Sequence, residues 1–160
     1  MSDMQALLNT LPQAGTLMWI GIRPAKKYAL TTTDVAQISA ESGLDGDHYR
    51  GKSKKRQVTL IQREHLDAVG NILGKTINPG LTRRNLVVEG INLLSLADRK
   101  FRIGDEVVLE TTGLCHPCSR MEENLGAGGY NAMRGHGGIT ATVVSGGTIK
   151  VGDAVKILAE

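Results

Sequence analysis

The stretch FRIGDEVVL (101–109) returns near the end of the chain as IKVGDAVKI (149–157). Both copies read apolar, polar, apolar, Gly, Asp, any residue, Val, any residue, apolar. Alternation of apolar and polar residues is typical of a half-buried strand, and a Gly-Asp pair is typical of a tight turn. Each copy therefore predicts a strand that enters a turn and leaves as a second strand, with Asp105 and Asp153 as turn residues.

The strand pattern recurs along the rest of the chain. Short β-branched or alternating runs are bounded by Gly, Asn, Asp or Pro, and helices do not alternate with them, which favours an antiparallel barrel over a doubly wound sheet. The clearest helix is 63–73, where an apolar face includes Leu66 and Ile72 and Gly74 supplies a stop. We predict a mainly β fold, a barrel with a few short helices. Strands are expected at 16–23, 34–40, 56–61, 85–90, 106–112, 141–146 and 154–159.

Length and composition bound the class of protein. The chain has 160 residues, so we predict one domain over 1–160, with core motifs at about 16–158 and an N-terminal extension over 1–15. Hydrophobic residues make up 41% and charged residues 22%, which excludes the disordered and fibrous classes. The first thirty residues show neither a signal-peptide layout nor a membrane-spanning run. We therefore expect a cytoplasmic protein with reduced thiols and no membrane partner.

The charge pattern is mild. The net charge is +3, and the strongest local excess of basic residues is confined to the segment 50–56. That run alone does not make a nucleic-acid binder, so nucleic acid is a less favoured partner. A non-enzymatic barrel that grips RNA through this segment stays open as an alternative function.

The only two cysteines, Cys115 and Cys118, lie three positions apart in GLCHPCSRME (113–122). A structural zinc site needs about four ligands, and beside the two cysteines the chain offers only distant histidines such as His116 or His136, with no second CxxC. A thioredoxin-like redox pair belongs to a βαβ fold that the chain does not show. Two buried inert thiols, or one reactive sulfur with a bystander, are the remaining interpretations. The residues alone leave all of these open.

A short helix is predicted directly after Cys118, with Ser119 as the N-cap and Glu122 as its capping-box partner. Cys118 then lies at the positive end of that helix, which favours its thiolate. Arg120 and Arg134 add positive charge if the fold brings them near. Cys118 is therefore the better nucleophile or soft-metal ligand of the two thiols.

Six glycines fall between Gly126 and Gly138, a density that a barrel strand does not use. Gly126 is expected to end the short helix. The remaining segment predicts an irregular loop, whose exposed backbone N–H groups suit an anionic or heteroatom-rich ligand.

Five segments in a fixed order carry the strongest functional signal; they are GLDGDHYRG (43–51), RQVTLIQREHL (56–66), LTRRNLVVEGINL (81–93), FRIGDEVVLETTGLCHPCSRM (101–121) and GHGGITATVVSGGTIKVGD (135–153). Together they resemble MOSC-domain proteins, named for the C-terminal domain of molybdenum-cofactor sulfurases, and in particular the stand-alone bacterial members. The resemblance covers most of the chain from about Thr16. It implies a MOSC-type, pyruvate-kinase-barrel-like β-barrel, a pocket for the molybdenum cofactor, and a cysteine that ligates molybdenum or carries a persulfide sulfur.

The resemblance also implies roles for single residues. Cys118 matches the position that binds the metal in the amidoxime-reducing members, which leaves Cys115 as a bystander. The segment RRN (83–85) matches a cofactor-contacting segment, whereas residues 116–117 are His and Pro where those reductases carry a more polar pair. GDHYRG and the glycine-flanked His136 resemble recurrent features of the stand-alone bacterial members. The expected cofactor contacts are Arg83, Arg84, Asn85, His48, His116, Arg120, Arg134 and His136.

The implied function is binding of the molybdenum cofactor, Mo-molybdopterin, through one thiolate. Dithiolene sulfurs and oxo groups supply the other ligands, so one soft protein ligand suffices. The implied activity is either reduction of N-hydroxylated compounds with an electron-transfer protein, or transfer of cofactor or sulfur. In the second case a pyridoxal-phosphate-dependent sulfurtransferase partner supplies the sulfur, because no pyridoxal-phosphate domain is expected here. A structural zinc protein remains the other alternative.

Overall fold

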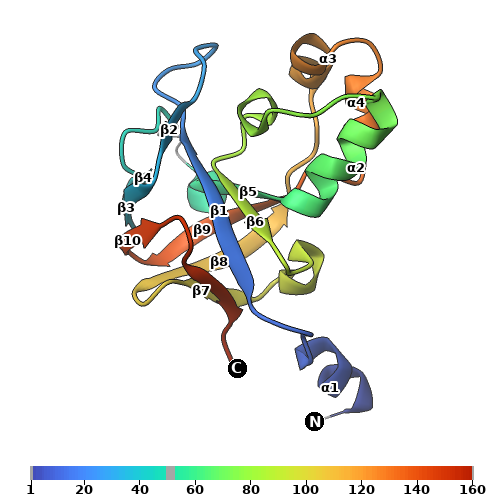
Figure 1. The fold of residues 1–160 in the computed structure, drawn as a ribbon. Coiled ribbons are helices and arrows are strands. Elements are labelled where there is room, and N and C mark those ends of the chain that lie inside the picture. Colours follow the sequence, from blue (N-terminus) through green and yellow to red (C-terminus); the bar gives the residue numbers. More distant parts are fainter. Residues whose placement is uncertain (1, 50–52, 160) are drawn as a thin grey trace.

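The computed structural model describes residues 2–49 and 53–159, and its centre is a closed β-barrel (Figure 1). The barrel strands are β1 (Gly15–Ile22), β5 (Val58–Gln62), β6 (Leu86–Glu89), β7 (Lys100–Ile103), β8 (Val107–Leu114), β9 (Ile139–Ser145) and β11 (Ala154–Ile157). They follow one another in the order β11, β7, β8, β9, β5, β6, β1, and β1 pairs with β11 to close the ring. The prediction of a mainly β barrel is confirmed.

One strand pair departs from the predicted antiparallel arrangement. Strands β5 and β6 run parallel, with Leu60 opposite Leu86. A parallel pair needs a crossover connection, and α2 (Arg63–Leu73) begins that connection directly after β5. The expectation of an antiparallel barrel was therefore wrong at this one position.

A smaller sheet lies beside the barrel and consists of β10 (Gly147–Lys150), β3 (Val35–Ser39) and β4 (Gly43–Leu44). The short strand β2 (Thr31–Thr33) pairs antiparallel with the end of β1. The two sequence copies behave differently within this arrangement. The first forms the β7–β8 hairpin, whereas the second forms a corner where β10 of the small sheet passes into β11 of the barrel. In the corner turn the backbone N–H of Lys150 donates to Asp153 Oδ2 over 2.8 Å, so Asp153 is a turn residue as predicted.

The barrel interior is filled by aliphatic side chains around a single aromatic ring, that of Phe101, which is fully buried. Alternate residues of each strand point inward. On β5 and β6, however, every residue of VTLI and LVV is buried, because a second layer covers the outer face of these two strands.

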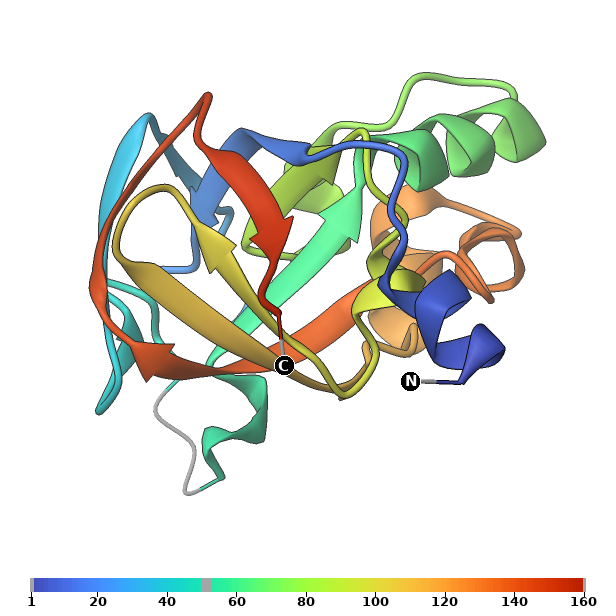
Figure 2. The ribbon, with the colours of Figure 1, turned by 90° about the horizontal axis from the view of Figure 1, so that it is seen from below.

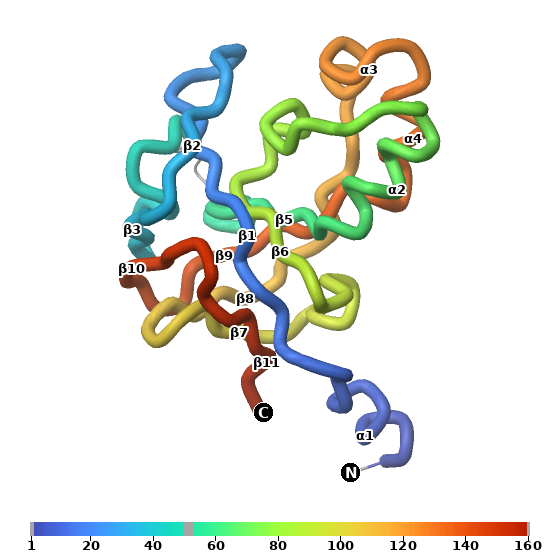
Figure 3. Tube along the Cα trace, in the orientation of Figure 1, coloured from blue at the N-terminus to red at the C-terminus, as the bar shows by residue number. Residues whose placement is uncertain are grey.

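Three helices form this second layer: α2, α3 (Ser119–Leu125) and α4 (Gly129–Met133). Figures 2 and 3 show all three gathered on one side of the barrel. Their apolar residues, such as Leu66 and Met121, pack with Ile61 and Val87 from the outer face of the barrel. Trp19 joins this second core and is only half-buried, so it is not a filler of the barrel interior.

Helix α2 has the predicted bounds and ends at Gly74, which adopts the left-handed conformation. Its apolar face is narrower than predicted. Leu66 and Val69 are buried, but Ile72 lies at the edge of the face and is 61% exposed. None of the helices formed by the described residues has the length and apolar character needed to cross a membrane.

Short 3-10 turns complete the connections: η1 (Lys54–Arg56), η2 (Pro79–Thr82) and η3 (Leu93–Leu96). The N-terminal helix α1 (Asp3–Asn9) falls within the expected extension and projects from the lower end of the barrel (Figure 1).

Candidate functional site

The cysteine segment joins the end of β8 to the start of α3, at the boundary between the barrel and the helical layer. Cys115 is buried and Cys118 is exposed, and both are free thiols. Cys118 itself is the N-cap residue of α3, without a side-chain capping bond. The two sulfur atoms thus face different surroundings, and only that of Cys118 is open to solvent.

The predicted capping box at α3 was wrong. Ser119 is the first helical residue, not the N-cap, because the chain enters the helix one residue earlier than predicted. The carboxylate of Glu122 instead accepts the backbone N–H groups of Gly128 and Tyr130, 2.9 and 3.0 Å away. These hydrogen bonds lower the pKa of Glu122 and satisfy the free N–H groups at the start of α4. Gly126 ends α3 as predicted.

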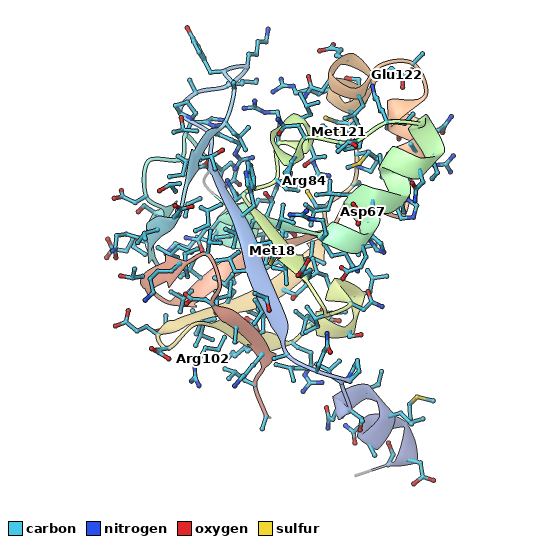
Figure 4. All side chains as sticks on the ribbon, in the orientation of Figure 1. Met18, Asp67, Arg84, Arg102, Met121 and Glu122 are labelled. Atoms are coloured by element: carbon cyan, nitrogen blue, oxygen red, sulfur yellow. The ribbon has the colours of Figure 1, made fainter. Side chains whose placement is uncertain are left out.

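Arg84 is buried, and its hydrogen bonds support the backbone of the cysteine segment (Figure 4). Its guanidinium donates to the carbonyl oxygens of Thr82, Gly137 and Cys115, each 2.9 Å away. Burial lowers the pKa of Arg84, while the charges of Cys115 and Cys118 act in the opposite direction. Arg84 therefore fixes the backbone around the two thiols and contributes positive charge near both, but its hydrogen-bond donors are already engaged.

Arg83 and Arg120 are two cationic residues whose charges interact, and Arg120 follows Cys118 by two positions in the chain. Arg83 adopts the left-handed conformation, and its guanidinium donates to the carbonyl oxygens of Tyr28 and Ala25 over 2.7 and 3.4 Å. Burial lowers the pKa of Arg83, and the like charge of Arg120 lowers it further. Within the part of the chain that the structure describes, Arg120 has no hydrogen-bond or ion-pair partner. Two guanidinium groups are thus held close together with one of them unpaired.

Beneath these arginines lies a buried polar network that the sequence did not predict. Arg23 and Asp47 form an ion pair, with Nη2 2.8 Å from Oδ2. Burial acts to raise the pKa of Asp47, but hydrogen bonds and charge from Arg23 hold it below the ordinary value. Asn85 is fully buried, donates to Asp47 Oδ1 and to the carbonyl of Gly21, and accepts from Thr59.

Asn85 was expected to contact the cofactor, but its amide is hydrogen-bonded within the protein. An amide whose oxygen and nitrogen both bond inside the protein connects strands instead of presenting itself to a ligand. His48 lies at the rim of the same network, where its backbone N–H donates to the carbonyl of Arg23 and its Nδ1 is 3.3 Å from the same oxygen. No sequence signal marked Arg23, because it follows an ordinary strand and its partners come from distant segments.

A pocket of about 140 Å³ opens on the other side of the cysteine segment. Its wall is mainly apolar, and Cys118 does not line it, although the three residues before Cys118 do. His136 adjoins the pocket, with Nδ1 2.9 Å from the carbonyl of Ala132 and its ring edge-to-face with His65. The lining residues are Gln62, His65, Leu93, Leu94, Leu114, Cys115, His116, Pro117, Gly135, Gly137 and Gly138.

His65 lies on α2, opposite the segment after α4. It is half-buried because the segment after α4 covers this side of α2. Arg134, in contrast, is exposed, and among the described residues its side chain donates only to Asn131 Oδ1, 3.4 Å away.

The glycine segment is more compact than predicted. A Cβ at Gly137 would lie 2.0 Å from the carbonyl oxygen of Cys115, and one at Gly138 would lie 1.9 Å from that of Leu60. These glycines permit close backbone contact, and the carbonyl of Gly138 accepts the N–H of Cys115 over 2.8 Å. The expected wall of free N–H groups is therefore replaced here by backbone packing.

The alternative functions find little support. Across residues 2–49 and 53–159, no three His, Cys, Asp or Glu side chains gather to hold a metal ion, so structural zinc is not favoured. In the basic segment, Arg50 and Lys52 lie outside the described residues. Arg56 donates from Nη2 to Cys115 Sγ over 3.8 Å, which ties this arginine to the cysteine segment instead of leaving it for RNA.

Comparison with known proteins gives one family match and several structural neighbours. Residues 45–156 match the family model for the MOSC domain. The YuaD protein from Bacillus subtilis has a TM-score of 0.80 and 18% identity, over 92% of this chain and 98% of that one. YiiM from Geobacillus stearothermophilus has a TM-score of 0.75 and 13% identity, over 91% and 75% of the two chains. YiiM from Escherichia coli has a TM-score of 0.70 and 16% identity, over 93% and 71%. No curated protein matches the chain.

Proposed function

Because this chain belongs to the MOSC-domain family, we propose that it binds the molybdenum cofactor with the Cys118 thiolate as the protein ligand to molybdenum. The observation that carries the proposal is the pairing of an exposed thiol with an unpaired cation two residues later in the chain. Cys118 is open to solvent at the start of α3, and Arg120 has no partner among the described residues. A soft anion beside a free guanidinium suits a ligand that combines a soft metal centre with an anionic tail.

The residues around Cys118 fit such a group in chemistry and in charge. Cys118 offers the one thiolate that a dithiolene-bound metal still needs. Arg120 offers a guanidinium group, which can bind phosphate in a bidentate manner, while Arg83, whose Nη1 and Nη2 donate to Tyr28 and Ala25, adds positive charge. Burial is the main cause of the lowered pKa of Arg83 and the like charge of Arg120 adds to it, and a bound anion would relieve that repulsion.

The remaining expected contacts act in a supporting role. Arg84 holds the backbone of Cys115 and Gly137, and Asn85 holds Asp47, which in turn neutralises Arg23. Because the side chains of Arg84 and Asn85 are already hydrogen-bonded within the protein, direct contact with the cofactor is left to residues that keep free hydrogen-bond donors. We therefore expect Arg120 to contribute more to cofactor affinity than Arg84 or Asn85.

The pocket beside the cysteine segment favours a small-molecule substrate over a purely carrier role. It is lined by the residues that directly precede Cys118, and its wall is mainly apolar. Bound molybdenum supplies the two-electron chemistry that reduction of an N-hydroxylated compound needs. The protein's part would be to admit the uncharged compound and to hold it against the apolar wall that Leu93, Leu94 and Leu114 form beside the cysteine segment.

The direct test measures molybdenum and pterin in protein purified from a host that makes the cofactor and is supplied with molybdate. Cys118→Ser should lose both, while Cys115→Ser should keep both in stoichiometric ratio. Since Cys115 is buried, the thermal midpoint of each variant is measured so that loss of fold is separated from loss of ligand. Equal cofactor content in all three proteins would remove Cys118 from the site.

A second measurement separates reduction from sulfur transfer. The purified chain is incubated with a pyridoxal-phosphate-dependent cysteine desulfurase and free cysteine, and the intact mass is recorded. Reduction predicts no stable adduct and turnover of an N-hydroxylated compound by the cofactor-loaded protein with an electron donor. Addition of one sulfur atom that is lost in Cys118→Ser would instead assign the carrier role.

A further inference from the structure

The N-terminal helix α1 exposes an apolar stripe that no other part of the described chain covers. Met4, Leu7 and Leu8 lie on one side of the helix and are 62%, 69% and 59% exposed. No residue of α1 is buried. Figures 1 and 3 show the helix standing away from the barrel. Three large apolar side chains in a row on so small an element are unusual for a surface that stays in water.

A helix of this length is not stable by itself. α1 has seven residues, and isolated helices shorter than about twelve residues are marginal in water because nucleation is costly. The capping box between Ser2 and Gln5 fixes where the helix begins, but capping alone does not offset that cost. Most helices of this kind gain their stability by burying an apolar face.

The chain also carries a groove next to the end of α1. It has a volume of about 340 Å³ and an apolar floor made by Leu11, Ile91, Val155 and Ile157. Of the described residues that line it, only Lys156 is charged. The groove thus matches the apolar stripe of α1 in character, with one positive charge beside it.

The helix cannot fill this groove in its own chain. Both ends of the connecting segment are fixed, because Arg99 donates to Asn9 Oδ1 over 2.8 Å and Gln13 donates to the carbonyl of Gly90 over 3.2 Å. Asn9 and Gln13 themselves line the groove. α1 is therefore held beside the groove and points away from it.

The geometry points to a second copy of this chain as the partner: in a symmetric dimer, α1 of each copy lies in the groove of the other. A projecting element and a recess of matching character on the same face are the self-complementary surface that a two-fold axis requires. Charge supports the same pairing, since Asp3 is the only charged residue of α1 and Lys156 the only one in the groove lining. When the two copies exchange their helices, each of the two symmetric contacts brings Asp3 of one copy to the groove that contains Lys156 of the other.

A membrane surface fits α1 less well. Interfacial helices carry Lys or Arg on the polar face to bind anionic lipids, and α1 carries no basic residue. Its single charge is negative and would be repelled by such a surface. The stripe is therefore assigned to a protein groove, and lipid binding becomes an outcome of the test.

The first experiment measures the mass of the full chain by sedimentation velocity from low micromolar to submillimolar concentration. The unaltered chain should show a concentration-dependent dimer. Leu7→Glu should raise its dissociation constant by about tenfold or more, because it places a carboxylate in the apolar contact. The matched control is Ile72→Glu on α2, which is equally exposed but far from the groove, and it should leave the dimer unchanged.

A charge exchange then tests the pairing itself. Asp3→Lys and Lys156→Asp should each weaken the dimer, and the double variant should recover most of the association. A structural effect of either change on its own protomer would add, not cancel. The proposal is overturned by a monomer at every concentration, by a dimer that ignores Leu7→Glu, or by binding of α1 to anionic phosphatidylserine vesicles that Leu7→Glu abolishes.

Discussion

His65 of α2 and His136 of the segment after α4 meet edge to face, with their ring centroids 5.0 Å apart and their planes inclined by 66°. His136 is further fixed by its Nδ1 contact with the carbonyl of Ala132. Burial lowers the pKa of His65, the charge of His136 lowers it further, and Glu64 acts in the opposite direction. Burial and the neighbouring His136 thus disfavour the charged form of the His65 ring.

This pair predicts a loss of stability in mild acid. The pKa of His65 lies below its unfolded value of 6.5, so the unfolded chain binds more protons as the pH falls through that value. The stability that the neutral ring contributes is present above about pH 6.5 and is lost as the pH falls through the folded pKa. The slope is bounded by about 1.4 kcal/mol per pH unit, and solvent screening of the half-buried ring makes it smaller.

The measurement is urea unfolding between about pH 7 and about pH 5. His65→Gln should flatten the dependence of the unfolding free energy on pH. His116→Gln is the matched control, because that imidazole is exposed and has no ring partner among the described residues. If both substitutions flatten the profile equally, the contact between the two rings does not cause the effect.

The sequence predicted the strands because their pattern is local, whereas it could not predict how they pair. Each of the seven expected strands is present to within about three residues. The parallel pair of β5 with β6 and the closure of β1 on β11 depend on segments far apart, and such pairing leaves no periodic signal. The corner at Gly152 and the hairpin at Gly104 share one sequence motif, yet tertiary pairing makes them different structures.

The same limit applies to the candidate site. The exposed start of α3 at Cys118 follows from local helix signals, which the sequence displays. The covering of His65 depends on the segment after α4, which comes from much later in the chain. Glu122 shows the same difficulty, because a capping box and a cap on the next helix use the same residue type, and only the three-dimensional arrangement decides between them.

The ion pair between Arg23 and Asp47 predicts that substitutions of two nearby aspartates have very different effects on the free energy of unfolding. Asp47→Asn should lower the unfolding free energy by about 3 to 5 kcal/mol, because it leaves a mostly buried guanidinium without its countercharge. Asp45→Asn, two residues earlier and exposed, should change it by less than about 0.5 kcal/mol. Urea unfolding at neutral pH measures both. A similar small loss in the two variants would show that the network is not important for stability.

The acid response of this pair should be separate from that of the histidines. Hydrogen bonds from Arg23 keep the pKa of Asp47 below its unfolded value of 3.8 despite burial. The stability it contributes is therefore present above about pH 4 and is lost only as the pH falls through the lower folded pKa. Acid unfolding followed by circular dichroism measures this. Compared with the unaltered chain, Asp47→Asn should lose less further stability as the pH falls below about 4, and its pH dependence between about pH 7 and about pH 5 should be unchanged. A profile that loses its neutral-range slope in this variant would contradict the assignment.

Two arginines should have unequal effects on cofactor retention: Arg120, which is half-buried two residues after Cys118, and Arg134, which is exposed. Arg120→Gln should lower the amount of pterin retained after gel filtration by about tenfold, since a charge-assisted bond to phosphate is worth about 1.5 to 3 kcal/mol. Arg134→Gln removes the same charge from a side chain that bonds only to Asn131 in the described structure, and should retain the cofactor. Raising the salt concentration should reduce retention in the unaltered chain more than in Arg120→Gln. Equal retention in the two variants would mean that Arg120 does not contact the anion.

Two glycines of the segment before β9 share a left-handed backbone but differ in their surroundings, which separates backbone strain from close packing. Gly135 has a φ of 80° and nothing within 4 Å of an added Cβ, whereas Gly138 has a φ of 86° and Leu60 O at 1.9 Å. Gly135→Ala should cost about 1 kcal/mol for the left-handed conformation alone. Gly138→Ala should cost roughly 2 to 4 kcal/mol, because the overlap with the β5 backbone adds to the same strain.

The consequence of Gly138→Ala should extend to the cysteine segment. The carbonyl of Gly138 accepts the N–H of Cys115, so a shift of this residue away from Leu60 moves the backbone that leads to Cys118. The rate at which a thiol-specific reagent modifies Cys118 should therefore change in Gly138→Ala and stay constant in Gly135→Ala, under conditions where both variants are folded. If the two alanine variants lose equal stability and react at equal rates, close backbone packing at Gly138 does not position the exposed sulfur.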